Sequence, residues 1–214
     1  EPHGDNLGFN DDVIAPECST HDRLDYVDAF VQELQILGFV GSTENVGIRR
    51  VGLLSAHLVF EAVRGHVRRQ EQIALQQHGL SWRLNDEGSS LASAVQAFAE
   101  LHQQCWQHRG KNGNLAETRF RAFVERFAES ASRRGWLRLH RLCDGPRTVA
   151  ALLAFHHHGR AYYYQSGWNP AIAKLSPGSL CVDRAVRTAI EEGLTVFDFL
   201  RGDEPYKRRW SNRQ

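Results

Sequence analysis

The 214-residue sequence contains no methionine, only four cysteines and no long apolar run. None of its hydrophobic stretches approaches the roughly 20 residues that a membrane-spanning helix needs, and no signal-peptide pattern is visible. The cysteines are isolated, so neither a disulfide framework nor a zinc-ligand pair is indicated. Because isolated thiols are typical of a reducing compartment, we expect a cytoplasmic protein with no membrane span. We interpret all four as small buried side chains: Cys18, Cys105, Cys143 and Cys181.

Several catalytic signatures are absent as well. The sequence has no G-x-S-x-G nucleophile elbow, no Walker loop, no H-E-x-x-H pair and no Rossmann glycine fingerprint. Hydrolase, ATPase, zinc-protease and dehydrogenase functions therefore lack support. In the run "HHH", His156 and His158 share one face of an expected strand, but no carboxylate or thiol has a suitable spacing. We interpret them as polar residues at a strand end, and we expect no metal.

The remaining composition is ordinary for a globular protein, with 42% hydrophobic and 24% charged residues. The charge is unevenly distributed: residues 1–106 carry 7 basic and 15 acidic side chains, a net of −8, whereas residues 107–214 carry 19 and 10, a net of +9. This polarity indicates either an anionic partner for the second half or two lobes of opposite charge that face each other. Because residue 1 is Glu and methionine is absent, we also expect that some residues of the natural chain are missing.

Apolar periodicity predicts a series of helices and strands. Helices with a glycine or polar stop are expected at residues 22–37, 55–77, 90–108, 117–134 and 179–192. Strands are expected at residues 80–84, 136–142, 148–158, 160–168 and 195–200. The turns "CDGP" and "HGR" are short enough to join three of these strands as antiparallel hairpins. The second half therefore has the order two helices, three strands, helix, strand.

The stretch "YYYQSGWNPAIAKLSPGSL" joins a strand to a helix through a polar loop. A helix N-terminus presents unpaired N–H groups, and Gly178 would let a phosphate approach them closely, with Lys174 as a nearby positive charge. Ordinary capping explains the same residues, with Ser176 as N-cap and Pro177 in the first helical position. Both interpretations stay open from the residues alone.

The stretch "FDFLRGDEPYKRRW", residues 197–210, joins a buried strand to a dense group of both charges. Asp203 and Glu204 could act as a general base or hold an amine. The basic side chains could pair with phosphate or carboxylate: Arg201, Lys207, Arg208 and Arg209. The alternative is a solvated salt-bridge network that locks the end of the strand.

Together these stretches resemble the C-terminal signature of the CelD/BcsL-type acetyltransferases of the GNAT (Gcn5-related N-acetyltransferase) superfamily, close to the FemAB-like transferases. The matching elements are Y-Q-S-G, L-S-P-G, E-G-L and F-D-F-L-R-G-D-E-x-Y-K-x-x-W, over about residues 90–213. The resemblance implies an α/β (α+β) GNAT fold: a mixed, mostly antiparallel sheet with a splayed centre, flanked by helices. It also implies two lobes, with residues 1–89 as a shortened or partial N-terminal lobe and residues 90–214 as the acetyltransferase domain.

The resemblance further implies site residues. An acetyl-CoA or other acyl-CoA donor would lie along the strand before the loop, and its pyrophosphate would contact Lys174, Ser176, Gly178 and Ser179. Only Gly178 fits the usual Q/R-x-x-G-x-G/A pattern clearly. Asp203 or Glu204 is predicted as base or amine anchor, and Tyr206 or Tyr164 as acid for the departing thiolate. The residues predicted to order the site or to bind the acceptor are Arg201, Lys207 and Gln165.

Three functions follow from the resemblance. The first is an N-acyltransferase that acylates an amine of a small metabolite or saccharide precursor. The second is a FemAB-like transferase that uses aminoacyl-tRNA, which would suit the net charge of +9 in the second half, although no long basic helical arm is visible. The third is a non-catalytic GNAT-like domain that binds a nucleotide or a partner protein. A homodimer is left open.

Overall fold

The computed structural model describes residues 50–52, 61–200 and 205–210, all of which belong to one compact unit formed by residues 45–214. The helix expected over residues 22–37 lies outside these residues. So do the first residues of the helix expected over 55–77.

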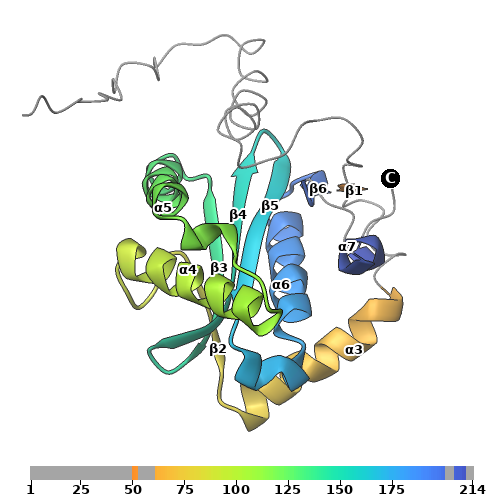
Figure 1. Cartoon of the computed structure of the whole chain (residues 1–214). Coiled ribbons are helices and arrows are strands. Elements are labelled where there is room, and N and C mark those ends of the chain that lie inside the picture. The colour runs from red at the N-terminus through yellow and green to blue at the C-terminus, as the bar shows by residue number, and fades with distance from the viewer. Residues whose placement is uncertain (1–49, 53–60, 201–204, 211–214) are drawn as a thin grey trace, which may run out of the picture. The chain divides into compact units, whose positions relative to one another are not determined.

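Six strands form one mixed sheet in the order β1–β6–β5–β4–β3–β2 (Figure 1). Neighbouring strands are antiparallel except for β5 and β6, which are parallel. Their bounds are β1 Arg50–Gly52, β2 Ser81–Leu84, β3 Leu137–Asp144, β4 Arg147–His157, β5 Arg160–Trp168 and β6 Val196–Asp198.

The hairpins predicted for the three central strands are confirmed. Strands β3, β4 and β5 pair antiparallel in sequence order. Gly145 and Gly159 occupy the two turns with φ of 52° and 72°, a left-handed conformation that glycine adopts without steric cost.

The predicted helices that fall within the described residues are present, whereas the short helix Pro205–Trp210 was not predicted. Their bounds are α3 Glu61–Gln72 with a π-helical continuation η3 Ile73–Gln77, α4 Leu91–His108, α5 Thr118–Arg133, α6 Pro177–Glu191 and α7 Pro205–Trp210, with 3-10 turns η4 Asn114–Ala116 and η5 Pro170–Leu175. Helix α6 begins two residues before the predicted Ser179, because Pro177 fits the first helical position. The segment predicted as a polar loop before it contains η5.

The helices cover the two faces of the sheet in pairs. Alternate residues of β4, Ala150, Leu152 and Ala154, pack in one core cluster with buried residues of α6 and α3. Residues of α4 do not belong to that cluster. On the other face Phe155 of β4 packs edge-on against Phe127 of α5, with ring centroids 4.8 Å apart. Helices α4 and α5 therefore cover the face opposite α6 (Figure 1).

A charged group on α3 joins three elements. The Glu71 carboxylate accepts a hydrogen bond from Arg187 Nη2 of α6 at 2.6 Å and one from Trp82 Nε1 of β2 at 2.9 Å. Arg187 also forms an ion pair with Asp183, one turn earlier on α6, with Nε 2.8 Å from the carboxylate. Glu71 thus ties α3 to both the edge strand and the helix behind the sheet.

Just beyond β2, the Asn85 side chain makes hydrogen bonds to the backbone of β3, as a further strand residue would. Asn85 has φ of 50°, so the chain turns away after Leu84. Its Oδ1 accepts from the Leu139 N–H at 2.9 Å, and its Nδ2 donates to the Leu137 carbonyl at 3.2 Å. Part of the outer edge of β3 is therefore already hydrogen-bonded by the Asn85 amide.

The described cysteines are buried and unpaired, as predicted: Cys105, Cys143 and Cys181. Cys18 lies outside the described residues. Burial raises the pKa of Cys105 and Cys181, so both thiols are poor nucleophiles near neutral pH.

His156 differs from the sequence interpretation. It is 6% exposed rather than a polar strand end, and its Nδ1 lies 2.8 Å from Glu192 Oε2 just beyond α6. Arg138 of β3 donates to both carboxylate oxygens of Glu192, at 2.7 and 2.9 Å. The sequence separates these residues widely, so only the return of α6 over the sheet brings them together. His158 is exposed in the following turn, with φ of 46°.

His140 lies beside this group on β3 and is 2% exposed. Burial lowers its pKa to about 3, and the positive charges of Arg184 and Arg138 act in the same direction. Its Nε2 has no hydrogen-bond partner within the described ranges. The folded protein therefore holds His140 neutral at pH values where an unfolded chain would protonate it.

We expect His140 to make stability fall in mild acid. The unfolded imidazole titrates near pH 6.5 and the folded one near 3, so the contribution is complete above pH 6.5 and decreases by about 1.4 kcal/mol per pH unit below it. In the His140→Gln variant, one proton fewer is taken up on unfolding, so the free energy of unfolding should depend less steeply on pH. The urea midpoint should therefore fall less between pH 6.5 and 4.5 than it does in the wild type. His108→Gln, at an exposed histidine of α4, is the matched control. A variant as steep as the wild type would contradict this assignment.

Candidate active site

The parallel pairing of β5 and β6 is short. It joins Arg160 with Val196, Ala161 with Phe197 and Tyr162 with Asp198. Strand β5 then continues to Trp168 with no further β6 partner, and no other described strand pairs with this edge. From Tyr164 onward, the backbone N–H and C=O groups on that edge of β5 have no partner strand among the described residues, and they could bind an extended ligand.

A β-bulge lies in β5, two residues beyond its last pair with β6. The β4–β5 register passes from Ala154 opposite Tyr163 to Leu153 opposite Gln165, so Tyr164 is the extra residue. The side chains of Tyr164 and Gln165, although consecutive, therefore lie on the same face of the sheet. The Tyr164 ring meets Phe155 at 5.9 Å, and Gln165 Nε2 donates to Asn114 Oδ1 at 3.3 Å.

The chain leaves β5 for α6 through η5 and a left-handed residue. Asn169 begins η5 by accepting from the Ala171 N–H at 3.0 Å. Ser176 precedes α6 with φ of 54° and ψ of 48°, and its side chain makes no capping hydrogen bond. Ser176 therefore occupies the N-cap position without capping the helix. A left-handed non-glycine residue costs backbone energy, and such positions concentrate at binding sites.

The first turn of α6 is suited to an anion. It contains no acidic residue, and Lys174 is exposed just before it. A Cβ atom added at Gly178 would lie 3.6 Å from Trp168 Nε1, an ordinary van der Waals contact. The surrounding protein therefore leaves room for a side chain at this position. Gly178 keeps the first turn open on the side of Trp168.

Three hydroxyl groups form a chain where β5 and α7 meet. Tyr206 of α7 donates to the Tyr163 hydroxyl at 3.3 Å, and that hydroxyl lies 2.7 Å from Ser166 Oγ. Tyr163 is 6% exposed and packs against Phe199, whereas Tyr206 is 37% exposed. A buried tyrosine thus orients a more exposed one beside the unpaired edge of β5.

Comparison with known families decides the class of this arrangement. Residues 61–208 match the family model described as "Acetyltransferase (GNAT) domain". The chain belongs to the GNAT acetyltransferase family. A search of curated protein sequences finds no match.

Solved structures agree with this GNAT fold. The chain is similar to the crystal structure of FemX, with a TM-score of 0.60 and 13% identity over 85% of this chain and 64% of that one. It is also similar to the C-terminal domain of a putative lysylphosphatidylglycerol synthetase from Agrobacterium fabrum, with a TM-score of 0.50 and 9% identity over 75% of this chain and 48% of that one. The chain spans less than two thirds of either structure's length. These identities show the fold alone, and the predicted mixed, mostly antiparallel sheet flanked by helices is confirmed.

Some of the predicted site residues fall within the described part of the chain and others do not. Arg201, Asp203 and Glu204 lie outside the described residues. Tyr206 lies beside the unpaired edge of β5, and Lys207 on the same helix is 3% exposed. The proposed donor contacts lie together at the start of α6: Lys174, Ser176, Gly178 and Ser179.

Tyr164 and Tyr163 differ in surroundings. Burial raises the pKa of Tyr164, whose ring contacts Phe155. Tyr163 carries the hydroxyl chain, and sequence reasoning did not single it out. The alternation of faces along "YYY" places Tyr163 opposite its neighbours, and this was the signal available to find it.

Helix α4 and strand β5 approach each other very closely at Gly167. A Cβ atom at Gly167 of β5 would lie only 2.2 Å from the backbone nitrogen of His102 in α4. His102 is 1% exposed, accepts from Trp106 Nε1 at 2.8 Å, and has a pKa lowered by burial to about 4. Its Nδ1 has no partner in the described part of the chain. The sequence does not reveal this contact, because nothing near Gly167 marks a turn.

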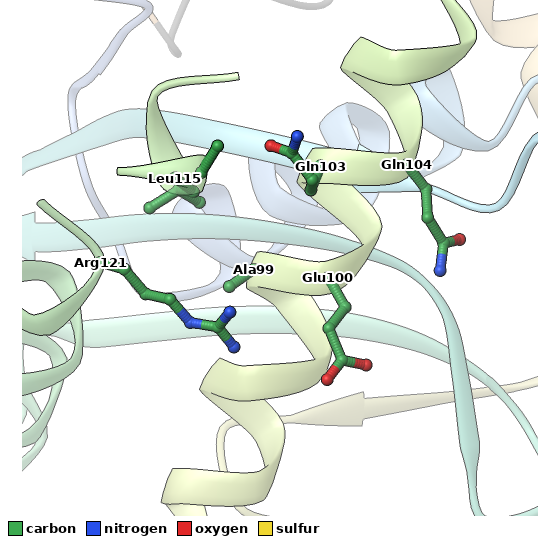
Figure 2. Close-up of a pocket in the computed structure, with 7 residues that line it drawn as sticks. Ala99, Glu100, Gln103, Gln104, Leu115 and Arg121 are labelled. Atoms are coloured by element: carbon green, nitrogen blue, oxygen red, sulfur yellow. The ribbon is translucent and has the colours of Figure 1, made fainter. Parts of the chain in front are cut away.

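A cavity of about 420 Å³ lies on the outer side of α4, next to η4 and α5. Figure 2 shows Glu100, Gln103 and Gln104 of α4 on one side, with Leu115 of η4 and Arg121 of α5 on the other. The lining holds one carboxylate and one guanidinium among amides; Arg121 forms an ion pair with Glu125 of its own helix, and Glu100 accepts from Gln96.

Two kinds of feature are absent from the described ranges. No three His, Cys, Asp or Glu side chains come together there as metal ligands would. None of the helices in those ranges has both the length and the apolar character of a membrane span.

We expect Gly167→Ala to destabilise the domain severely. The new methyl group would collide with α4 backbone rather than with a movable side chain, so the loss should be about 3 kcal/mol or more. The control is Gly65→Ala in α3, where a Cβ meets nothing within 4 Å and stability should rise by about 0.5–1 kcal/mol. Urea unfolding measures both. A loss below about 1 kcal/mol in Gly167→Ala would show that the close approach does not constrain the fold.

Proposed function

We propose that this GNAT domain is an N-acyltransferase of the CelD/BcsL type that takes its acyl group from acyl-CoA, most simply acetyl-CoA. The acceptor would be an amine of a small metabolite or saccharide precursor. The observation that carries the proposal is the succession of three features along one segment: a strand edge with no described partner strand from Tyr164 onward, an uncapped helix start, and Gly178 open to a ligand.

Each part of the segment fits one part of the donor. The free N–H and C=O groups of β5 suit the amide-bearing arm of a coenzyme thioester, and N–H groups beside the thioester carbonyl would polarise it. The first turn of α6 would bind the pyrophosphate through its N–H groups, with Ser176 and Ser179 as hydroxyl partners and Lys174 as a positive charge.

The reaction needs one base and one acid. Asp203 or Glu204 would accept the proton of the acceptor amine or anchor it, and the nitrogen would form a bond to the acyl carbon as the carbon–sulfur bond breaks. Tyr206 would protonate the departing thiolate. Its contact with Tyr163 supports this role, because the Tyr163 oxygen fixes the position of the phenol, whose proton would turn from that oxygen to the departing sulfur. Tyr164 is kept as a second candidate acid.

The acceptor would lie on the side of α4 and η4. Gln165, held by Asn114, is oriented toward that side, and we propose that it contacts the acceptor. Arg201 and Lys207 would order the charged segment or bind an anionic group of the acceptor. We propose residues 1–89 as a shortened first lobe and residues 90–214 as the catalytic one, with β1, α3 and β2 of the first segment packed in the same compact unit as the second. The protein would be cytoplasmic, since its unpaired cysteines suit a reducing compartment.

A second candidate is a FemAB-like transferase that uses aminoacyl-tRNA. The fold similarity to FemX favours it, and so does the net charge of +9 over residues 107–214. This alternative keeps the same catalytic chemistry and replaces the donor.

We expect acetyl-CoA to bind the full chain with micromolar affinity and Gly178→Glu to abolish binding. The introduced carboxylate would repel the donor phosphates, yet an acidic residue in the first turn favours the helix by about 0.3–1 kcal/mol. Loss of binding without loss of melting temperature therefore reports on the site. Gly178→Gln separates bulk from charge, and isothermal titration measures all three proteins.

A wild-type chain that binds neither acetyl-CoA nor longer acyl-CoAs would reject the acyl-CoA donor. Binding of charged tRNA, with an affinity that decreases steeply as salt rises, would then support the second candidate.

We expect Asp203→Asn and Tyr206→Phe to lower kcat by about 10²–10⁴-fold while donor affinity is retained. The pH dependence should separate the roles, because loss of a base removes the acidic limb of the kcat profile and loss of an acid removes the alkaline limb. Glu204→Gln is the comparison for the neighbouring carboxylate. Unchanged kcat at saturating substrates would remove the tested residue from the mechanism.

A further inference from the structure

A second cavity, of about 240 Å³, lies between the first half of α4 and the β3–β4 hairpin. It is on the α4 side of the sheet, whereas the proposed donor site begins α6, which covers the other side. The side chains that matter there are two arginines, three hydroxyl residues and one carboxylate: Arg141, Arg147, Ser89, Ser93, Thr148 and Glu100.

Arg141 occupies a position that the pattern of β3 reserves for core residues. It follows Leu137 and Leu139 on the face toward α4, both fully buried, and is itself 1% exposed. Its Nη2 donates to the Glu87 carbonyl at 2.7 Å, whereas its Nε has no hydrogen-bond partner among the described residues. Burial lowers the pKa of this guanidinium, which reflects the cost of holding the charge out of water. An arginine is rarely buried without a counter-charge.

The neighbouring charges act in both directions. Arg83 of β2 lies directly opposite Arg141 in the sheet, and like charges in that position repel. The Glu87 and Asp86 carboxylates are close enough to favour the Arg141 charge, but no carboxylate in the described ranges forms an ion pair with it. Glu87 Oε2 accepts from the Leu84 N–H at 2.9 Å, and Glu100 Oε1 accepts from Gln96 at 3.0 Å. The Arg141 guanidinium therefore lies at the cavity with no described carboxylate hydrogen-bonded to it.

The start of α4 adds to the same field. This helix has 18 residues and no acidic residue in its first turn. Ser90 caps it by accepting from the Ser93 N–H at 3.2 Å, and the hydroxyl-bearing Ser89 and Ser93 line the cavity. The positive end of the helix dipole, two guanidinium groups and several hydroxyl donors therefore face one small volume.

We propose that this cavity is a binding site for a small oxyanion, a phosphate or carboxylate group, separate from the acyl-donor site at α6. The anion would supply the acceptor that Arg141 Nε lacks and would relieve the repulsion between Arg83 and Arg141. Arg147 would contact it from the hairpin, and Glu100 would weaken its binding through like charge.

The test is a titration of the full ¹⁵N-labelled chain with inorganic phosphate at low salt, followed by backbone amide shifts, with sodium chloride at matched ionic strength as reference. We expect saturable shifts at residues 89–93 and 141–148. Arg147→Gln should weaken binding roughly tenfold, and Glu100→Gln should strengthen it severalfold, so the two variants move affinity in opposite directions. Arg133→Gln, the same charge change at an exposed position of α5, is the matched control and should leave affinity unchanged.

Sodium acetate in a parallel titration distinguishes the two anion classes, since the tighter ligand identifies the group that the site recognises. Arg141→Lys keeps the charge but removes the planar fork, and it should also weaken binding if it folds. Shifts without saturation, shifts confined to residues 178–180, or affinities that ignore both Arg147→Gln and Glu100→Gln would each overturn the proposal. None of these outcomes depends on acyl-CoA binding, so the proposal can fail or succeed independently of the proposed enzyme activity.

Discussion

The contact between α4 and β5 at Gly167 sets the geometry of the site. Helix and strand approach so closely that the space for a Cβ atom is occupied by the backbone of α4 at His102. A helix at ordinary packing distance would lie several ångströms farther from the strand. The turn after α4 could then no longer place Asn114 beside Gln165. The absence of a side chain at Gly167 thus allows α4 to pack closely on the second half of β5.

The bulge at Tyr164 and the end of β6 pairing at Tyr162 act together on the same strand. Between them they turn β5 from a central strand, hydrogen-bonded on both sides, into a strand with one open edge. The chain then passes through η5 to the uncapped first turn of α6. In the proposed mode of donor binding, one extended ligand would accept hydrogen bonds first from the N–H groups of the strand and then from those of the helix start.

The sequence predicts most of the elements and few of the contacts. Periodicity located the central hairpins and helices α4 and α5 because each buries one regular stripe of apolar residues. It placed Gly178 at the start of α6 because glycine and proline mark helix starts. The bulge at Tyr164 is beyond such reasoning, since it depends on register with β4. The buried Arg141 and the His156–Glu192 pair are likewise tertiary contacts between distant segments, and a local pattern records no distant partner.

The side chain of Asn85 has a consequence for assembly. An exposed strand edge invites another molecule to add a strand, and here the end of the sheet beside β2 is protected in two ways: β2 is only four residues long, and the Asn85 amide takes up the backbone groups of β3 just beyond it. A second copy of the chain could not pair with β3 beyond β2 without displacing the Asn85 amide, and β2 itself offers only a short edge. Any dimer that this protein forms would therefore be expected to avoid that edge and to use other surfaces, and the same protection should reduce aggregation during folding.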